Sequence, residues 1–299
     1  MSLEQAVLAS LAYSDIFDYP LNFGQIHNNL IFKKVLKNEL EKTVKRLSTE
    51  GKILKFGEFY QLKRQQNLAK KRYQHQKFAF QKLKRAKFAA KVLSLIPTVK
   101  LIGISGALAV LNTPKDDDID LFIVCSRRNL WTTRFFCNLF SDFLGLRRKP
   151  GKKEVANKIC LNMFVTEDSL KLTASDLYLA HEILQLKPLF EKDNTHSKFL
   201  KANSWAFKFL PNWPKPVNRK QLTVNRKQKF IFQFSVLEKI LRNFQLKYMS
   251  KRRTTEKISD TRLFFHPHDV RQKVLIEFEK RLKELKIPLD PSTSSGSVP

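Results

Sequence analysis

The stretch from Gly103 to Val124, GISGALAVLNTPKDDDIDLFIV, decides how the rest of the chain is read. Four of its residues are aspartates, at positions 116, 117, 118 and 120, and they stand directly before a run of strand-forming residues. Outward from the cluster, the nearest acidic residues are Glu58 and Asp142. The cluster is therefore an isolated anionic spot in a basic part of the chain.

Asp118 and Asp120 are spaced so that both side chains serve one site. Residues i and i+2 of a strand point to the same side, so we expect both carboxylates to share one side of a sheet while Ile119 enters the core. Two carboxylates placed in this way can jointly hold a divalent metal ion.

The hydrophobic pattern on both sides of this stretch alternates between strands and helices. TVKLIGIS, DLFIVCS and NKICLNMFVTE read as buried strands, whereas GALAVLN and NLWTTRFFCNLFSDFLG read as helices. This alternation predicts a mixed sheet covered by helices over residues 98–174. We expect residues 175–287 to be mostly helical and residues 288–299 to form a disordered tail.

Residues 1–64 show a different order, with three helical segments followed by the hairpin sequence KILKFGEFYQLK. That order is typical of a winged helix-turn-helix domain. Residues 65–97 then predict a basic amphipathic linker helix, whose Tyr73, Phe80 and Phe88 we expect to pack on the next domain rather than to stack on bases. The predicted fold class is therefore α+β.

The charge of the chain is its most unusual bulk property. The 299 residues carry a formal net charge of +29. A charge of this size attracts phosphate backbones or anionic membranes. The alternative interpretation is a lysine-rich composition without any such partner. No apolar run approaches the roughly 20 residues of a membrane span, and the N-terminus lacks signal-peptide order. We expect a cytoplasmic protein with no membrane partner, and we interpret Cys125, Cys137 and Cys160 as reduced core residues.

Other metal and phosphate motifs do not fit the aspartate cluster. An EF-hand needs glycine where Leu121 stands and glutamate where Arg127 stands. Neither GxxxxGK[ST] nor GxGxxG occurs here.

SGALA followed by DDIDLFIV resembles the polymerase-beta-type nucleotidyltransferases, in which a Gly-Ser or Gly-Gly pair opens a short helix and Asp-x-Asp follows on the next strand. The resemblance to bacterial proteins with such a domain extends over most of the chain. It implies that Asp118 and Asp120 bind Mg²⁺ or Mn²⁺, and that Ser105, Gly106 and the nearby amide of Ala107 contact the triphosphate of an NTP.

The chain departs from this pattern at two positions. Ala107 stands where the family usually has a serine, and Asn162 aligns with the third acid that activates the attacking hydroxyl. The acids Glu167 and Asp168 come only at the end of that strand.

The sequence thus supports two hypotheses. The first is a Mg²⁺-dependent nucleotidyltransferase that moves NMP from an NTP to a hydroxyl of a nucleic acid, a protein or a small molecule. The alternative is a non-catalytic nucleotidyltransferase-fold regulator that binds nucleic acid. Two cationic groups are candidates for contacts with phosphate, although both also fit a solvated surface: the arginines at 127, 128 and 134, and the segment 215–253.

Overall fold

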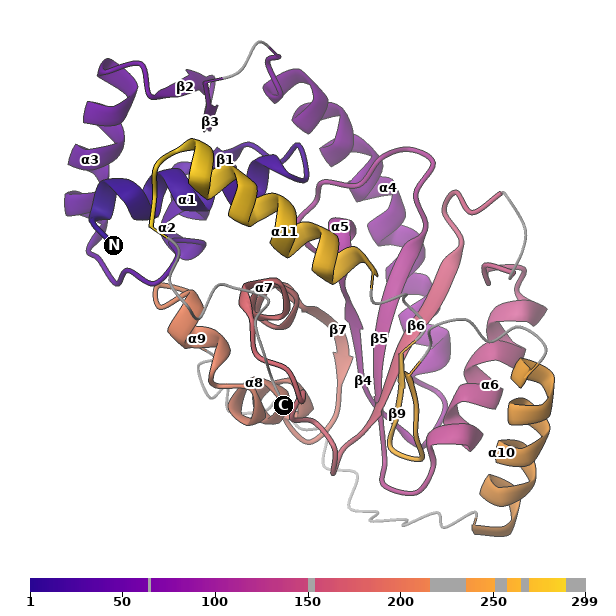
Figure 1. The fold of residues 1–299 in the computed structure, drawn as a ribbon. Helices are drawn as coiled ribbons and strands as arrows, with labels where there is room; N and C mark the ends of the chain where they lie inside the picture. Colours follow the sequence, from indigo (N-terminus) through magenta and orange to yellow (C-terminus); the bar gives the residue numbers. More distant parts are fainter. Residues whose placement is uncertain (64–65, 150–153, 216–234, 251–256, 265–268, 289–299) are drawn as a thin grey trace.

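The computed structural model describes residues 1–63, 66–149, 154–215, 235–250, 257–264 and 269–288, and these confirm the predicted α+β class (Figure 1). The helices are α1 (Leu3–Asp15), α2 (Phe23–Asn28), α3 (Lys37–Thr49), α4 (Ala69–Leu93), α5 (Gly106–Ala109), α6 (Leu130–Phe143), α7 (Leu177–Gln185), α8 (Thr195–Ala202), α9 (Ala206–Phe209), α10 (Ser235–Ser250) and α11 (Asp269–Glu284). The strands are β1 (Leu21–Asn22), β2 (Ile53–Phe56), β3 (Phe59–Leu62), β4 (Val99–Ile104), β5 (Ile119–Cys125), β6 (Ile159–Thr166), β7 (Lys187–Glu191), β8 (Lys257–Ile258) and β9 (Arg262–Phe264).

The N-terminal unit runs from α1 to β3 and has its own hydrophobic core. Ser2 and Asn22 begin α1 and α2 with capping boxes, because each accepts a hydrogen bond from the backbone of a glutamine three residues later. Gly57, with φ of +59°, makes the turn between β2 and β3. The sheet order is β1-β3-β2, so a short strand that the sequence did not suggest joins the predicted hairpin.

The larger sheet has six strands in the order β7-β4-β5-β6-β9-β8. Of these pairs, β5 and β6 run parallel and the others run antiparallel. Three of the strands come from residues 175–287, and the other described elements of this region are helices, as expected. The sheet therefore extends past residue 174, where the sequence placed the end of the core.

Helices cover both faces of this sheet, and alternate residues of β5 serve the two faces. Leu121 and Ile123 pack with α4, α6 and α10, whereas Phe122 and Val124 pack with α7, α8 and α11. Ile119 is fully buried in the first of these clusters, as predicted. By the two-residue period of a strand, Asp120 belongs to the face of Phe122 and hence to the side of α7.

The long basic helix α4 is part of the sheet core as well as a connection. Its alanines, including Ala79, Ala86 and Ala90, are buried against the sheet. We expected its aromatic residues to pack on the next domain, and this was wrong. Tyr73, Phe80 and Phe88 are 43%, 57% and 51% exposed. The alanine side of the helix faces the sheet because small side chains let the backbone approach closely, and this turns the rings outward.

Among the helices in the described part of the chain, none is long and apolar enough to cross a membrane.

Candidate functional site

Asp118 and Asp120 lie at the entry of β5, one of the two central strands of the larger sheet, and their side chains converge. Carboxylate oxygens of both residues and the sulfur of Cys160 all lie within 4.8 Å of one another. Cys160 joins them because it is the direct partner of Asp120 across the parallel pair of β5 and β6. The predicted side-by-side arrangement of the two carboxylates is thus present.

Gly106 lies directly against this pair. Its φ of +62° is a left-handed conformation that side chains disfavour, and a Cβ added there would lie 3.4 Å from Oδ2 of Asp120. The preceding Ser105 donates its backbone N–H to the carbonyl oxygen of Asp120 at 3.2 Å. Gly106 and Ala107 are the first two residues of α5. The structure therefore brings Ser105 and Gly106 to Asp120, and Ala107 follows them in α5.

Lys82 of α4 fixes the loop that leads into the aspartates. Its side chain is buried, with 1% exposure, and its Nζ donates to the carbonyl oxygens of Lys115 and Asp117 at 3.0 and 2.5 Å. Burial lowers the pKa of this ammonium, and the nearby Asp117 and Asp118 act in the opposite direction. Asp117 also accepts the backbone N–H of Asp118. Asp116 and Asp117 thus belong to the loop, and Asp117 helps to shape it.

Arg148 is the cationic partner of Asp118. Its Nη1 lies 2.6 Å from Oδ2 of Asp118, whose side chain is 9% exposed. Burial raises the pKa of Asp118, and so does the carboxylate of Asp120, whereas the hydrogen bond from Arg148 lowers it. Because the carboxylate of Asp120 opposes the charged form of Asp118, a cation between the two would be stabilised by both.

Asn162, which the resemblance aligned with the third acid, lies on the strand next to the aspartates. Asn162 lies on β6 at a shift in register, because Leu121 pairs with Leu161 whereas Phe122 pairs with Met163; its side chain is outside the described part. Among the β6 side chains that the structure describes, that of Cys160 reaches the aspartates. Burial raises the pKa of its thiol, and both aspartates add to this effect, so the sulfur stays protonated at neutral pH.

Glu167 and Asp168 cannot complete this site, because they follow β6 at its far end. There Glu167 accepts the backbone N–H of Arg127, and Asp168 pairs with its guanidinium at 3.1 Å. β5 and β6 run parallel, so this end lies roughly 20 Å from Asp120 at about 3.3 Å per residue.

The three arginines that were candidates for phosphate contacts follow β5 along the chain. Arg127 and Arg128 follow the far end of β5, and Arg134 on α6 hydrogen-bonds Oε1 of Gln245 at 2.5 Å. Of the cationic segment 215–253, residues 216–234 and 251–253 lie outside the described part, and α10 occupies most of the remainder.

Helix α7 packs on the face of the sheet to which Asp120 belongs. Burial raises the pKa of Tyr178 on this helix, and Glu182 and Asp120 raise it further, so its phenol lies within electrostatic reach of Asp120. Asp176, which caps α7 by accepting the backbone N–H of Leu179, forms an ion pair with Arg271 of α11. Nothing in the local sequence of α7 indicated this role.

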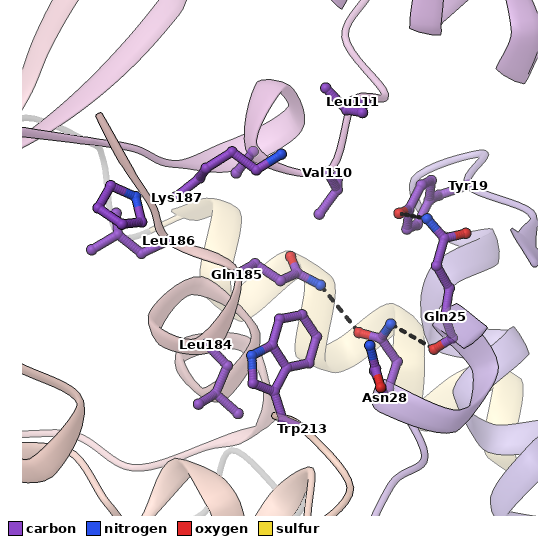
Figure 2. A pocket seen from close by; sticks show the side chains of 13 residues that line it. Tyr19, Gln25, Asn28, Val110, Leu111, Leu184, Gln185, Leu186, Lys187 and Trp213 are labelled. Atoms are coloured by element: carbon purple, nitrogen blue, oxygen red, sulfur yellow. Dashed lines mark hydrogen bonds between the residues drawn. The ribbon is translucent and has the colours of Figure 1, made fainter. Parts of the chain in front are cut away.

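A separate cavity of about 340 Å³ lies between the N-terminal unit and the larger unit, at the other end of α5 (Figure 2). Its lining includes the carboxamides of Gln25, Asn28, Asn29 and Gln185, and among the described residues that line it none is acidic. Two of these amides bond each other, since Nε2 of Gln185 donates to Oδ1 of Asn29 at 3.2 Å. The cavity is distinct from the aspartate site, because Val110 and Leu111 line it whereas Gly106 faces Asp120.

Comparison with known proteins finds no matching family model, no matching curated protein and no matching solved structure. The geometry of the site therefore carries the functional argument by itself. Two of its members, Arg148 and Cys160, were missed by sequence reasoning. Arg148 is 30 positions from Asp118 along the chain, and no motif linked them; the apolar neighbours of Cys160 suggested only a core residue.

Proposed function

We propose that the protein is a Mg²⁺-dependent nucleotidyltransferase that moves NMP from an NTP to a hydroxyl acceptor. The observation that carries this proposal is the convergence of the carboxylates of Asp118 and Asp120 beside the left-handed turn at Gly106. Phosphoryl and nucleotidyl transfer depends mainly on positioning and on neutralisation of charge, which two carboxylates and a glycine turn can provide together.

The donor atoms at this site suit magnesium or manganese. Both ions prefer oxygen ligands, and Asp118 and Asp120 offer carboxylate oxygens. A bound ion would supply charge neutralisation for the triphosphate. Cys160 is not a ligand for a hard ion in its protonated state, so we assign the ion to the two aspartates alone.

The remaining residues position the reactants. The turn at Ser105 and Gly106 exposes backbone next to Asp120, where no Cβ obstructs a phosphate group. Lys82 holds the loop before the aspartates, which keeps the two carboxylates in place when the charge between them changes. Arg148 can pair with phosphate oxygens once it leaves Asp118, because guanidinium binds both kinds of oxyanion well.

The second candidate function is a regulator that binds nucleic acid without catalysis. Two observations favour it: the ion pair of Arg148 with Asp118, and the presence of Cys160 where a third acid would complete the site. A chain that had lost catalysis would keep the fold and the basic charge.

Nucleotide binding and transfer separate the two candidates. Calorimetry with ATP and Mg²⁺, followed by a screen for transfer of radiolabelled NMP to nucleic acid, protein and small-molecule acceptors, should show both binding and transfer. The double variant Asp118→Asn, Asp120→Asn should abolish transfer while leaving the melting temperature near that of the wild type. Absence of nucleotide binding in the wild type would leave only the regulator.

We also propose that the N-terminal unit is a winged helix that targets the enzyme to a partner. Support comes from its order of helices and strands and from the antiparallel sheet β1-β3-β2. The third helix, α3, has exposed Lys42 and Lys45 but also exposed Glu41, and its Arg46 pairs with Glu4 at 2.9 Å. Duplex DNA binding measured against salt concentration tests this role, because phosphate contacts require a steep salt dependence.

A further inference from the structure

Helix α4 presents a continuous stripe of alternating aromatic rings and lysines to solvent. Phe80 and Phe88 are more than half exposed, and Tyr73 nearly so, although it also contacts Phe59 edge-on with centroids 5.2 Å apart. At 3.6 residues per turn, three exposed lysines fall on the same side of the helix as these rings. In chain order the stripe consists of Tyr73, Lys77, Phe80, Lys84, Phe88 and Lys91.

The charge of the stripe is not compensated locally. The sequence has no acidic residue between Glu58 and Asp116, so α4 itself supplies none. Within the described part of the chain, the one ion pair recorded for α4 joins Lys71 to Asp18, and neither residue belongs to the stripe. Lys87, beside the stripe, also contributes to the lowered pKa of Lys187 on β7, after the larger effect of burial, so cationic groups continue onto the neighbouring strand.

We propose that the stripe on α4 binds single-stranded nucleic acid. Lysines attract the phosphates, and exposed rings stack on bases without reading their sequence. At a rise of 1.5 Å per residue, the three rings are spaced by about 10 and 12 Å, so one strand running along the helix meets all three. The rings of Phe80 and Phe88 lie mostly in water, whereas the packing of α4 on the sheet is done by the alanines on the opposite side.

The order of residues within the stripe favours this occupant over a membrane surface. An interfacial membrane helix separates an apolar face from a cationic one. Here the apolar face of α4 is already buried against the sheet, and Lys77 and Lys84 stand between the exposed rings. If the rings entered the lipid, the ammonium groups of Lys77 and Lys84 would have to enter it as well, which is unfavourable for charged groups.

The stripe is independent of the proposed catalytic site. Lys82, which holds the loop before the aspartates, lies on the opposite side of α4 from Tyr73 and Lys91. Asp120 faces α7, on the other side of the sheet from α4. Substitutions in the stripe therefore leave the metal ligands untouched, and strand binding and nucleotidyl transfer can fail separately.

Fluorescence anisotropy with labelled oligo-dT and oligo-U of about 20 nucleotides, longer than the site sizes usual for such surfaces, tests the proposal on the full chain. The double variant Phe80→Ala, Phe88→Ala should weaken binding on the order of tenfold or more per ring. The triple variant Lys77→Glu, Lys84→Glu, Lys91→Glu should weaken it further. It should also reduce the slope of log affinity against log salt by about 2, at about 0.7 per lost phosphate contact.

The matched control is a second triple variant with the same change of net charge on the other side of the sheet. It replaces three exposed lysines of α8 and α9: Lys198→Glu, Lys201→Glu and Lys208→Glu. It should bind the oligonucleotides much more tightly than the α4 triple variant does. Equal weakening by both triple variants, or no effect of removing the rings, overturns the proposal. So does a stripe-dependent interaction with phosphatidylserine vesicles in place of oligonucleotides, since this would assign the stripe to a membrane. Circular dichroism of every variant checks that the fold is kept.

Discussion

Arg148 and Asp118 form an ion pair, in which Nη1 of Arg148 lies 2.6 Å from Oδ2 of Asp118, and both Asp118 and Asp120 raise the pKa of this arginine. Burial of Arg148 acts against them and lowers it. Arg148 and a divalent cation would thus compete for one carboxylate. This competition makes the affinity for metal a direct test of the site.

Arg148→Gln should tighten the binding of Mn²⁺, because it removes a cation that competes for Asp118. Arg148 is 42% exposed, so solvent screens the pair and the expected gain is only about two- to tenfold. The matched control is Arg147→Gln, since Arg147 pairs with Asp142 and not with the site. Mn²⁺ titration followed by electron paramagnetic resonance measures both affinities. Equal affinities in the two variants would contradict the competition.

Cys160→Asp should add a third carboxylate to the two that the described residues bring together. The new carboxylate would stand directly opposite Asp120 on β6, so we expect on the order of tenfold tighter Mn²⁺ binding. Without metal, three neighbouring carboxylates repel one another, and the melting temperature should fall and recover on addition of Mn²⁺.

The control variant for Cys160→Asp is Asn162→Asp, at the position that the family resemblance matched with the third acid. The register shift between β5 and β6 makes Cys160 the residue paired with Asp120, so we expect Asn162→Asp to have the smaller effect on affinity. A larger effect at Asn162 would show that the third acid belongs there.

Gly103→Ala should destabilise the fold. A Cβ at Gly103 would lie 2.9 Å from Cδ1 and 3.0 Å from Cγ of Leu186, closer than packed carbon atoms allow. Overpacking of this kind costs about 1–3 kcal/mol of unfolding free energy. Gly24→Ala in α2 is the control, because its nearest contact would be Oδ1 of Asn22 at 3.6 Å and alanine favours a helix. Urea denaturation should show a loss for Gly103→Ala and no loss for Gly24→Ala.

His181 should make the protein less stable in acid. Its ring stacks on Tyr13 with centroids 4.2 Å apart, and burial lowers its pKa to about 3. The unfolded chain binds a proton at an ordinary pKa of about 6.5, whereas the folded chain does not until near pH 3, so stability falls as the pH falls through this window. Between about pH 7.5 and 5.5 the loss from this residue is about 1.4 kcal/mol.

His181→Phe keeps a ring against Tyr13 and has no proton to bind. The difference in unfolding free energy between the two pH values should therefore be smaller in this variant than in the wild type. An identical pH dependence in both proteins would show that His181 is not the group responsible.

Local patterns in the sequence were enough to predict the entry of the aspartates into β5 and the turn at Gly106. Both depend on residues that are close along the chain: a two-residue period for Asp118 and Asp120, and a glycine before a short helix. The buried position of Ile119 followed from the same period. Such patterns depend on local backbone geometry. Tertiary packing did not change the local backbone geometry at these residues.

The other members of the site depend on tertiary structure. A register shift of one residue on β6 decides that Cys160 stands beside Asp120, and no local pattern encodes such a shift. Arg148 reaches Asp118 from a loop after α6. The exposure of Phe80 and Phe88 was also mispredicted, because the pattern of α4 shows two distinct faces but does not say which of them meets the sheet.

The central placement of β5 has a consequence for the motions of the site. This strand has hydrogen-bonded neighbours on both edges and buried side chains on both faces, so its amide protons exchange with solvent only when the whole sheet opens. The carboxylates at its start are thus anchored to the slowest-opening segment of the molecule. Little rearrangement energy is then lost when an ion settles between them.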